Sequence, residues 1–277
     1  MTDGVAGHAP PARHTSGLPT GDLLDMVTVT VDLPTPAVAL AVGAHPDDIE
    51  FGAGATLARW AAEGCLVHHL VLTDGSKGSW DPGADLAALV AARSDECRDA
   101  AVRLARGDPA AAGRVQFLGE VDGELANGTG QRREVARAIR TVRPDVLLGH
   151  DPWRRYRLHP DHRAAGFLTL DALVAARDPH FLPELALPPH RPAALLLWEA
   201  DLVNHVEPCP ADAAAAKVAA LLCHHSQHES TMGVSDRSSG SESGPEVFAA
   251  RIAWQLAQHG AVADLDAGEA FHLLDQL

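Results

Sequence analysis

The sequence predicts an α/β fold in which a mostly parallel sheet is covered by helices on both faces. Short continuous apolar runs, of which AVALAVGAH (residues 37–45) is the first, have the length and composition of strands buried on both sides. Segments with helical spacing follow these runs, and such alternation is typical of parallel strands joined by crossover helices. We therefore expect a Rossmann-like three-layer architecture.

Five strands and their helices can be placed in order along the chain. The helical segment after the first strand ends at Gly64, because glycine commonly terminates helices. A later helix ends at Pro144, since proline cannot continue it. The other strands are expected at CLVHHLVLTDG (65–75), VQFLG (115–119), DVLLGH (145–150) and AALLLWEA (193–200), with helices at about 52–64, 84–106, 131–144, 159–176, 211–226 and 246–259.

The chain is expected to hold one domain. Residues 1–33 are rich in Gly, Pro, Ala, Ser and Thr, which predicts a flexible N-terminal tail ending in one added strand or turn. Residues 34–277 then form a single domain with a C-terminal elaboration, in which GEAFHLL (268–274) is ambiguous. The proline-rich segment 178–210 is expected to wall the functional site and to influence substrate choice.

The composition argues against several classes of function. The 277 residues carry a net charge of −15, which disfavours binding to nucleic acid or to an anionic membrane. No apolar run reaches the roughly 18 residues of a membrane span, and no signal-peptide pattern is visible, so we expect a cytoplasmic location. The four scattered cysteines form no CxxC pair and predict neither a disulfide framework nor a zinc ribbon. The expected partner is a small molecule, and homo-oligomers are compatible with the sequence.

The first candidate cluster is AHPDD, at the end of the first predicted strand. It places His45, Asp47 and Asp48 within four positions. Imidazole and carboxylate form a natural zinc pair, and a catalytic zinc usually has three protein ligands and an open position for water. Because adjacent aspartates do not readily bind one ion in the same way, we expect one to bind the metal and the other to act as a base toward water. The alternative is that both carboxylates cap the following helix.

The second candidate cluster is HPDH, after the fourth predicted strand. One histidine, either His159 or His162, would complete a set of two histidines and one carboxylate with His45 and Asp48. The other would face the substrate carbonyl, where it would stabilise an oxyanion or protonate the leaving amine. Asp161 would orient a histidine through a hydrogen bond. A capped helix start with surface histidines is the alternative.

The positions of both clusters favour the functional interpretation. Both follow strands of one parallel sheet, and sites in such folds lie beyond the carboxyl ends of the strands. Ligands of this type suit zinc and also iron(II), and we favour one zinc per chain because a neighbouring base suits hydrolysis. A non-catalytic nucleotide- or sugar-binding module is the alternative of another class. GAGAT (52–56) is glycine-rich, but a dinucleotide fingerprint would stand directly after the strand, where HPDD lies.

These motifs resemble those of the PIG-L or LmbE-like N-acetylglucosaminyl deacetylases, from about Ala37 to Gln227. AHPDDIEFGAGATLARWAAEG resembles the opening motif of the family, and AHPDD followed by HPDH is a highly specific order. Supporting matches are LTDGSKG, the RxxE pattern at Arg93 and Glu96, FLGEVDGEL, RPDVLLGHDP, HPDHRAAG and KVAALLCHHSQ.

The resemblance implies a zinc-dependent hydrolase that removes an N-acetyl group from an N-acetylglucosamine-type sugar or glycoconjugate. It implies that His45, Asp48 and His162 are the zinc ligands and that Asp47 is the general base. The small-molecule substrate would then be an amino sugar or a related glycoconjugate.

The resemblance also implies roles for four further residues. His159 would polarise the tetrahedral intermediate, with Asp161 as its partner. Arg93 and Asp122 match positions that hold sugar hydroxyls in family members. The ordinary alternatives are a helix-surface ion pair for Arg93 and a turn aspartate in VDGEL for Asp122.

Two departures from the family pattern bear on the substrate. Ile49 precedes Glu50 where many relatives have a glutamate directly after the paired aspartates, and Ser76 and Lys77 stand where many have a glutamate. Neither touches the proposed metal set, but both alter the expected wall of the site. The same zinc site would suit an amidase acting on a mycothiol S-conjugate or an antibiotic-tailoring deacylase, and the sequence does not choose between them.

Overall fold

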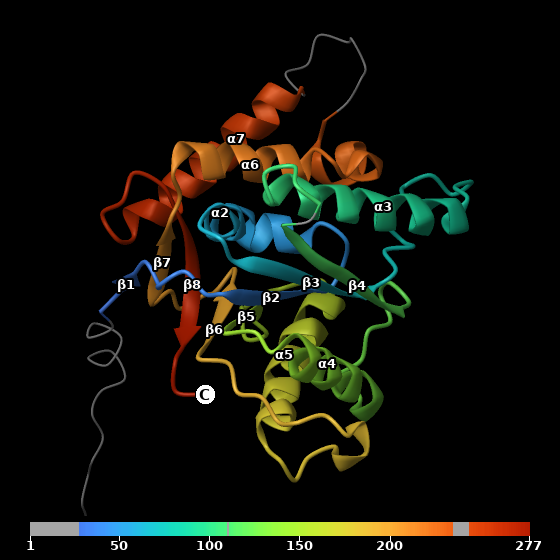
Figure 1. Cartoon of the computed structure of the whole chain (residues 1–277). Coiled ribbons are helices and arrows are strands. Elements are labelled where there is room, and N and C mark those ends of the chain that lie inside the picture. Colours follow the sequence, from blue (N-terminus) through green and yellow to red (C-terminus); the bar gives the residue numbers. More distant parts are fainter. Residues whose placement is uncertain (1–27, 110, 235–243) are drawn as a thin grey trace, which may run out of the picture.

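The computed structural model describes residues 28–109, 111–234 and 244–277. Within these ranges the chain forms one eight-stranded sheet with the strand order β1-β7-β8-β6-β5-β2-β3-β4. All neighbouring strands are parallel except β8, which runs antiparallel to both β6 and β7. The predicted α/β class, with a mostly parallel sheet between two helical layers, is confirmed (Figure 1). The strands are β1 (Thr30–Val31), β2 (Val38–Gly43), β3 (Leu66–Thr73), β4 (Ala112–Glu120), β5 (Val146–His150), β6 (Ala194–Trp198), β7 (His205–Pro208) and β8 (Gly268–Leu274).

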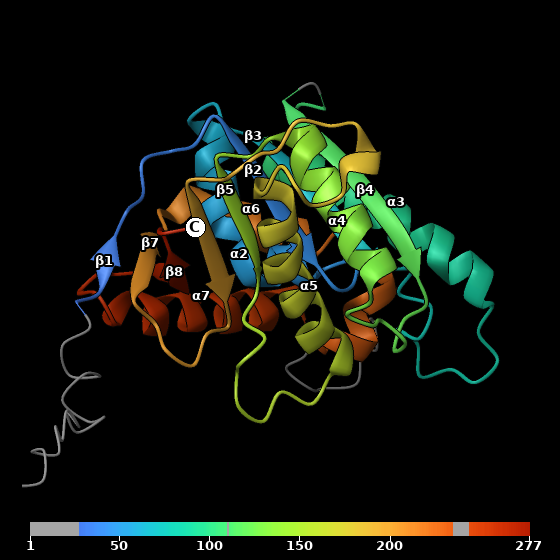
Figure 2. The same ribbon diagram turned by 90° about the horizontal axis from the view of Figure 1, so that it is seen from below.

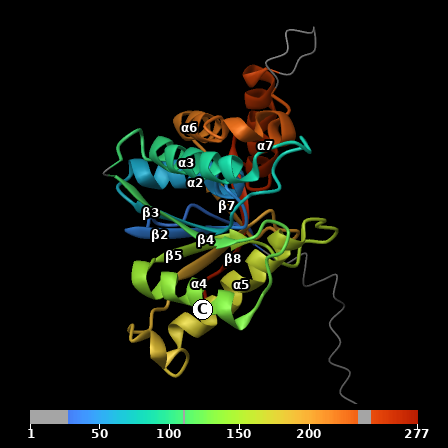
Figure 3. The same ribbon diagram turned by 90° about the vertical axis from the view of Figure 1, so that its right-hand side faces the viewer.

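The helices cover both faces of the sheet. Figure 3 shows α2, α3, α6 and α7 on one face and α4 and α5 on the other, and Figure 2 views the sheet from the side of α4 and α5. Each layer has its own apolar core, one centred on Trp60 and Trp198 and one on Leu147 and Leu168. The α-helices are α2 (Asp48–Ala62), α3 (Leu86–Leu104), α4 (Thr129–Val142), α5 (Pro160–Arg177), α6 (Ala211–Leu221) and α7 (Pro245–Ala261).

The sheet holds strands that the apolar pattern does not reveal. β7 includes two polar residues, His205 and Glu207, which are buried and contact each other at 2.7 Å, so no continuous apolar run marks this strand. The ambiguous segment 268–274 forms β8. Of the predicted tail, residues 1–27 lie outside the described residues, and Thr30–Val31 pair with β7. No helix in the described ranges combines the length and apolar character that a membrane span requires.

The fold brings the predicted motifs together at one edge of the sheet. The segments that follow β2, β3, β4 and β5 all leave the carboxyl ends of adjacent parallel strands. AHPDD follows β2, and HPDH begins α5 after the loop that follows β5. The site therefore forms where the architecture of parallel sheets places sites.

The helix that begins at AHPDD is kinked, and a buried ion pair holds the kink. Ala53 has non-helical angles (φ −144°, ψ 15°), which leaves backbone groups on both sides without helical partners. Glu269 accepts hydrogen bonds from the N–H groups of Ala55 (3.0 Å) and Thr56 (2.7 Å). Lys217 donates to the carbonyl of Phe51 (2.7 Å) and to Glu269 (2.6 Å). The two side chains thus replace the hydrogen bonds that the kink removes.

Replacing Lys217 with methionine is expected to lower the free energy of unfolding by about 3–5 kcal/mol, because the carboxylate of Glu269 would stay buried without its counter-charge. Chemical denaturation followed by circular dichroism measures this. Adding Glu269→Gln to Lys217→Met should restore part of the loss. The matched control is Arg98→Met, which removes an exposed ion pair with Asp95 and should cost at most about 1 kcal/mol. Equal effects in both single variants would contradict the prediction.

Candidate metal centre and active site

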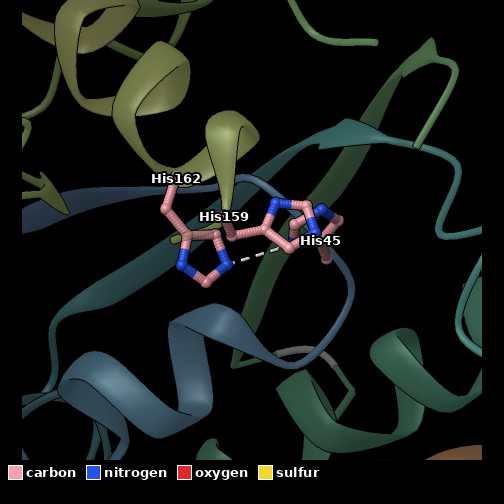
Figure 4. A group of neighbouring side chains, drawn as sticks. All are labelled: His45, His159 and His162. Atoms are coloured by element: carbon pink, nitrogen blue, oxygen red, sulfur yellow. Dashed lines mark hydrogen bonds between the residues drawn. The ribbon is translucent and has the colours of Figure 1, made fainter. Parts of the chain in front are cut away.

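Three side chains of the predicted set place their ligand atoms close together. His45 Nδ1 lies 3.2 Å from Asp48 Oδ2, and His162 Nε2 lies 3.2 Å from Asp48 Oδ1 and 3.3 Å from His45 Nδ1. Figure 4 shows His162 and His45 meeting at these ring nitrogens, with His159 beside them. Tetrahedral zinc with bonds of 2.0–2.1 Å separates its ligand atoms by about 3.3 Å. The residues therefore fit a small divalent cation in spacing and in donor type.

Carboxylates behind His45 complete this arrangement. His45 Nε2 lies 3.2 Å from Asp161 Oδ2 and 3.4 Å from Asp122 Oδ1. Burial lowers the pKa of His45, but the charge of Asp48 and contacts with Asp122 and Asp161 outweigh it and raise the pKa to about 12. The surroundings of this ring are therefore strongly negative, which favours a positive charge at the centre of the cluster.

The predicted pairing of Asp161 with His159 needs correction. The Asp161 carboxylate lies against His45 and accepts the backbone N–H groups of Gly123 (2.6 Å) and Leu125 (3.2 Å). Only the backbone N–H of Asp161 meets His159, donating to Nδ1 at 3.3 Å where His159 caps α5. Asp161 is fully buried, and its carboxylate contacts His45 and not the exposed His159.

His159 itself lies on the rim of the site. Its ring centroid is 4.5 Å from that of His45. Burial, followed by the charges of His45 and His162, lowers the pKa of His159, which favours the neutral ring near neutral pH. Because Nδ1 accepts the N–H of Asp161, the proton of the neutral ring sits on Nε2. His159 therefore offers one hydrogen-bond donor to a bound molecule.

Asp47 occupies a strained backbone position next to the cluster. It has φ 114° at the start of α2, and no side-chain cap hydrogen bond is formed there within the described residues. The alternative interpretation as a helix cap therefore does not describe this carboxylate. Burial raises the pKa of Asp47 to about 6, although the nearby charge of Arg93 opposes this rise. A buried carboxyl with such a pKa suits proton transfer near neutral pH.

Arg93 and Asp122 both lie at the site, and both have partners in the protein. Arg93 is 3% exposed and donates to the carbonyls of Gly75 (2.8 Å) and Pro46 (2.7 Å), with Nη2 3.5 Å from Asp47 Oδ2. It thus supports the strained turn that carries the proposed base. Asp122 accepts the backbone N–H of Lys77 at 3.1 Å and also faces His45. Their predicted contacts with sugar hydroxyls stay predictions.

The cluster opens into a cavity of about 530 Å³, which lies within the roughly 300–1,000 Å³ typical of small-molecule sites. The wall of this cavity includes Phe51, Trp80 and Gln227, none of which had been assigned to the site. Gln227 is the last residue of KVAALLCHHSQ, a segment that resembles the family pattern, so the sequence offered a reason to expect Gln227 at the site. Of the described residues in the proline-rich segment 178–210, Glu199 alone lines the cavity. The prediction that this segment walls the site is therefore wrong for most of its length.

The glycine-rich GAGAT segment has a packing role. A side chain at Gly52 would meet the ring of Trp198 at 2.5 Å, and one at Gly54 would meet Lys217 at 3.0 Å. These glycines let α2 approach its neighbours closely. Close packing thus accounts for the glycines of GAGAT, and binding of a nucleotide phosphate is not needed to explain them.

The fold and the site together have the features of a metal-dependent amide hydrolase. A sequence model of the PIG-L family, described as GlcNAc-PI de-N-acetylase, matches residues 40–173. Diacetylchitobiose deacetylase from Thermococcus kodakarensis is 32% identical over 191 residues, which cover 68% of this chain and 69% of that protein. The chain belongs to the PIG-L family of LmbE-like deacetylases.

Other relatives support this placement. A 1D-myo-inositol 2-acetamido-2-deoxy-alpha-D-glucopyranoside deacetylase from Streptomyces avermitilis is 35% identical, and the match covers 57% of this chain and 59% of that protein. The solved N,N'-diacetylchitobiose deacetylase from Pyrococcus horikoshii superposes with a TM-score of 0.75 at 23% identity, covering 92% of this chain and 89% of that one. This likeness shows a shared fold.

Proposed function

We propose that this protein is a zinc-dependent hydrolase that removes the N-acetyl group from an N-acetylglucosamine-type sugar or glycoconjugate. The observation that carries the proposal is that His45 Nδ1 and His162 Nε2 lie 3.3 Å apart, and that each lies 3.2 Å from an oxygen of the Asp48 carboxylate, beside the buried carboxyl of Asp47. The deacetylase activities in the names of the relatives from Thermococcus and Streptomyces agree with this chemistry.

His45, Asp48 and His162 would hold one zinc ion. When bound, zinc polarises a carbonyl oxygen and lowers the pKa of water to about 7. The fit rests on donor type and spacing, since the two imidazole nitrogens lie 3.3 Å apart and each lies 3.2 Å from an oxygen of the Asp48 carboxylate. Asp122 and Asp161 would fix His45 through its second ring nitrogen, as outer partners commonly do for metal-binding histidines.

The side chains around this centre would carry out the proton transfers of amide hydrolysis and stabilise the oxyanion. Asp47 accepts a proton from water as the water oxygen attacks the acetyl carbonyl carbon. His159 donates a hydrogen bond from Nε2 to the oxyanion that develops on the substrate. Asp47 then returns its proton to the departing nitrogen as the C–N bond breaks. Acetate and a free amine are the products, and Arg93 keeps the Asp47 turn in place throughout.

Trp80 offers an aromatic surface at the cavity for a unit attached to the acetylated sugar. Its side chain is 86% exposed while it lines the cavity. We expect Trp80→Ala to raise KM for a disaccharide about tenfold, equivalent to about 1.4 kcal/mol, and to change KM for N-acetylglucosamine much less. Trp254→Ala is the matched control, because Trp254 is 65% exposed on α7, outside the cavity wall. Equal KM for the disaccharide in both variants would argue against this role.

A reconstitution assay tests the proposed function. A chelator removes the metal from the purified protein, which is then reloaded with zinc or iron(II). Bound metal is analysed, and acetate release is measured with diacetylchitobiose and with N-acetylglucosaminyl-inositol as substrates. We expect about one zinc per chain and acetate release that depends on it. Thioether conjugates and acylated antibiotic sugars are tested as alternative substrates in the same assay. Absence of both metal binding and acetate release would refute the proposal.

A further inference from the structure

A fourth imidazole lies at the proposed metal centre without an assigned role. His150 ends β5 and is 1% exposed. Its ring stacks on His162 with a centroid distance of 4.5 Å, and its Nε2 lies 3.3 Å from Asp48 Oδ2. By position alone, Asp48, His150 and His162 form a possible ligand group, because their donor atoms lie within 4.8 Å of one another. His150 is therefore either an additional metal ligand or a partner of the Asp48 carboxylate.

The opposite side of the ring decides between these roles. Trp198 Nε1 and Arg157 Nη1 each lie 3.0 Å from His150 Nδ1. Indole and guanidinium nitrogens only donate hydrogen bonds, so Nδ1 must present its lone pair to them. Glu199 is 3.9 Å from Nδ1, but it contacts Arg157 Nη2 at 2.6 Å. A proton on Nδ1 would set an N–H against two donors inside the protein, which is costly for buried groups.

A His150 ring that holds one proton therefore carries it on Nε2. A nitrogen that carries a proton has no lone pair for a metal, whereas it can donate to the carboxylate of Asp48 at 3.3 Å. The backbone N–H of Ala44 donates to Nε2 at 3.4 Å, so a proton on Nε2 would oppose this one long contact, whereas a proton on Nδ1 would oppose two donors at 3.0 Å.

We propose that His150 is a positioning residue that holds the Asp48 carboxylate through Nε2–H, and that Trp198 and Arg157 fix this tautomer. Asp48 then has its orientation set from two sides, since the backbone N–H of His45 also donates to Oδ2 at 2.7 Å. Pre-orienting a ligand in this way strengthens metal binding without adding a metal–protein bond. The inference rests on the proposed metal site, but the tautomer is a property of the metal-free protein as well.

Long-range ¹H–¹⁵N NMR of the full-length protein, labelled at histidine ring nitrogens, tests the tautomer directly. With and without zinc, His150 is expected to show a protonated Nε2 and an unprotonated Nδ1. An Nε2 that loses its proton when zinc is added would make His150 a ligand and overturn the proposal, as would a ring protonated at both nitrogens.

Zinc titration of His150→Phe supplies the second readout. We expect affinity to fall about 10–100-fold, the usual effect of losing an outer partner, with the stoichiometry and the number of zinc-bound imidazoles in X-ray absorption unchanged at two. Loss of one imidazole, or unchanged affinity, would overturn the proposal. His180→Phe makes the same change at an exposed position and should leave affinity unaltered. If the unaltered protein binds no zinc, the proposed function fails, while the NMR result still judges the tautomer.

Discussion

Replacing Asp47 with asparagine should lower kcat for deacetylation by about 100- to 10,000-fold while one zinc stays bound. The expected loss is that of a general base, because asparagine keeps the shape of the side chain but cannot accept the proton of water. Asp47 contributes no ligand atom to the set formed by His45, Asp48 and His162. Metal analysis and single-turnover acetate release on the same sample measure the two properties separately.

The control for this prediction is a variant with an unaltered site. Asp95→Asn makes the same chemical change in an exposed carboxyl of α3 and should retain full activity. Retained activity in Asp47→Asn with normal zinc content would remove Asp47 from the role of base. Loss of zinc in Asp47→Asn would instead make this carboxyl a ligand.

Replacing His162 with alanine should remove both zinc and activity. The loss in affinity should exceed the roughly 10–100-fold effect of an outer partner, since one of three ligands is missing. The side chain of His162 is 23% exposed, so the fold should tolerate its removal, and thermal unfolding of the metal-free proteins can verify this.

His159→Ala is the comparison variant for His162→Ala, because the two are expected to differ in bound zinc. His159 is a neighbouring histidine on the same helix start, and it caps α5 without contacting Asp48. We expect His159→Ala to keep zinc and to lose activity through kcat. If His159→Ala loses zinc and His162→Ala keeps it, the two assignments are reversed.

Much of the fold was predictable from local patterns. Continuous apolar runs identified β2, β3, β5 and β6 because strands buried on both faces have no polar side to interrupt the pattern. β7 was missed since His205 and Glu207 are buried as a pair, and only their mutual contact makes those polar residues compatible with a strand. β8 was ambiguous because seven residues of mixed pattern do not define a partner or a direction.

The sequence by itself determined the class of fold and the two motifs, AHPDD and HPDH, that supply the candidate metal site, because both depend on short patterns at strand ends. Only the tertiary structure decided which carboxylate contacts which histidine, and which ring nitrogen of His150 carries the proton. Asp161 meets His45 across 116 positions, and Trp198 meets His150 across 48. Such contacts depend on distances of a few ångströms between side chains on different elements of the fold, and the spacing of residues along the chain does not determine those distances.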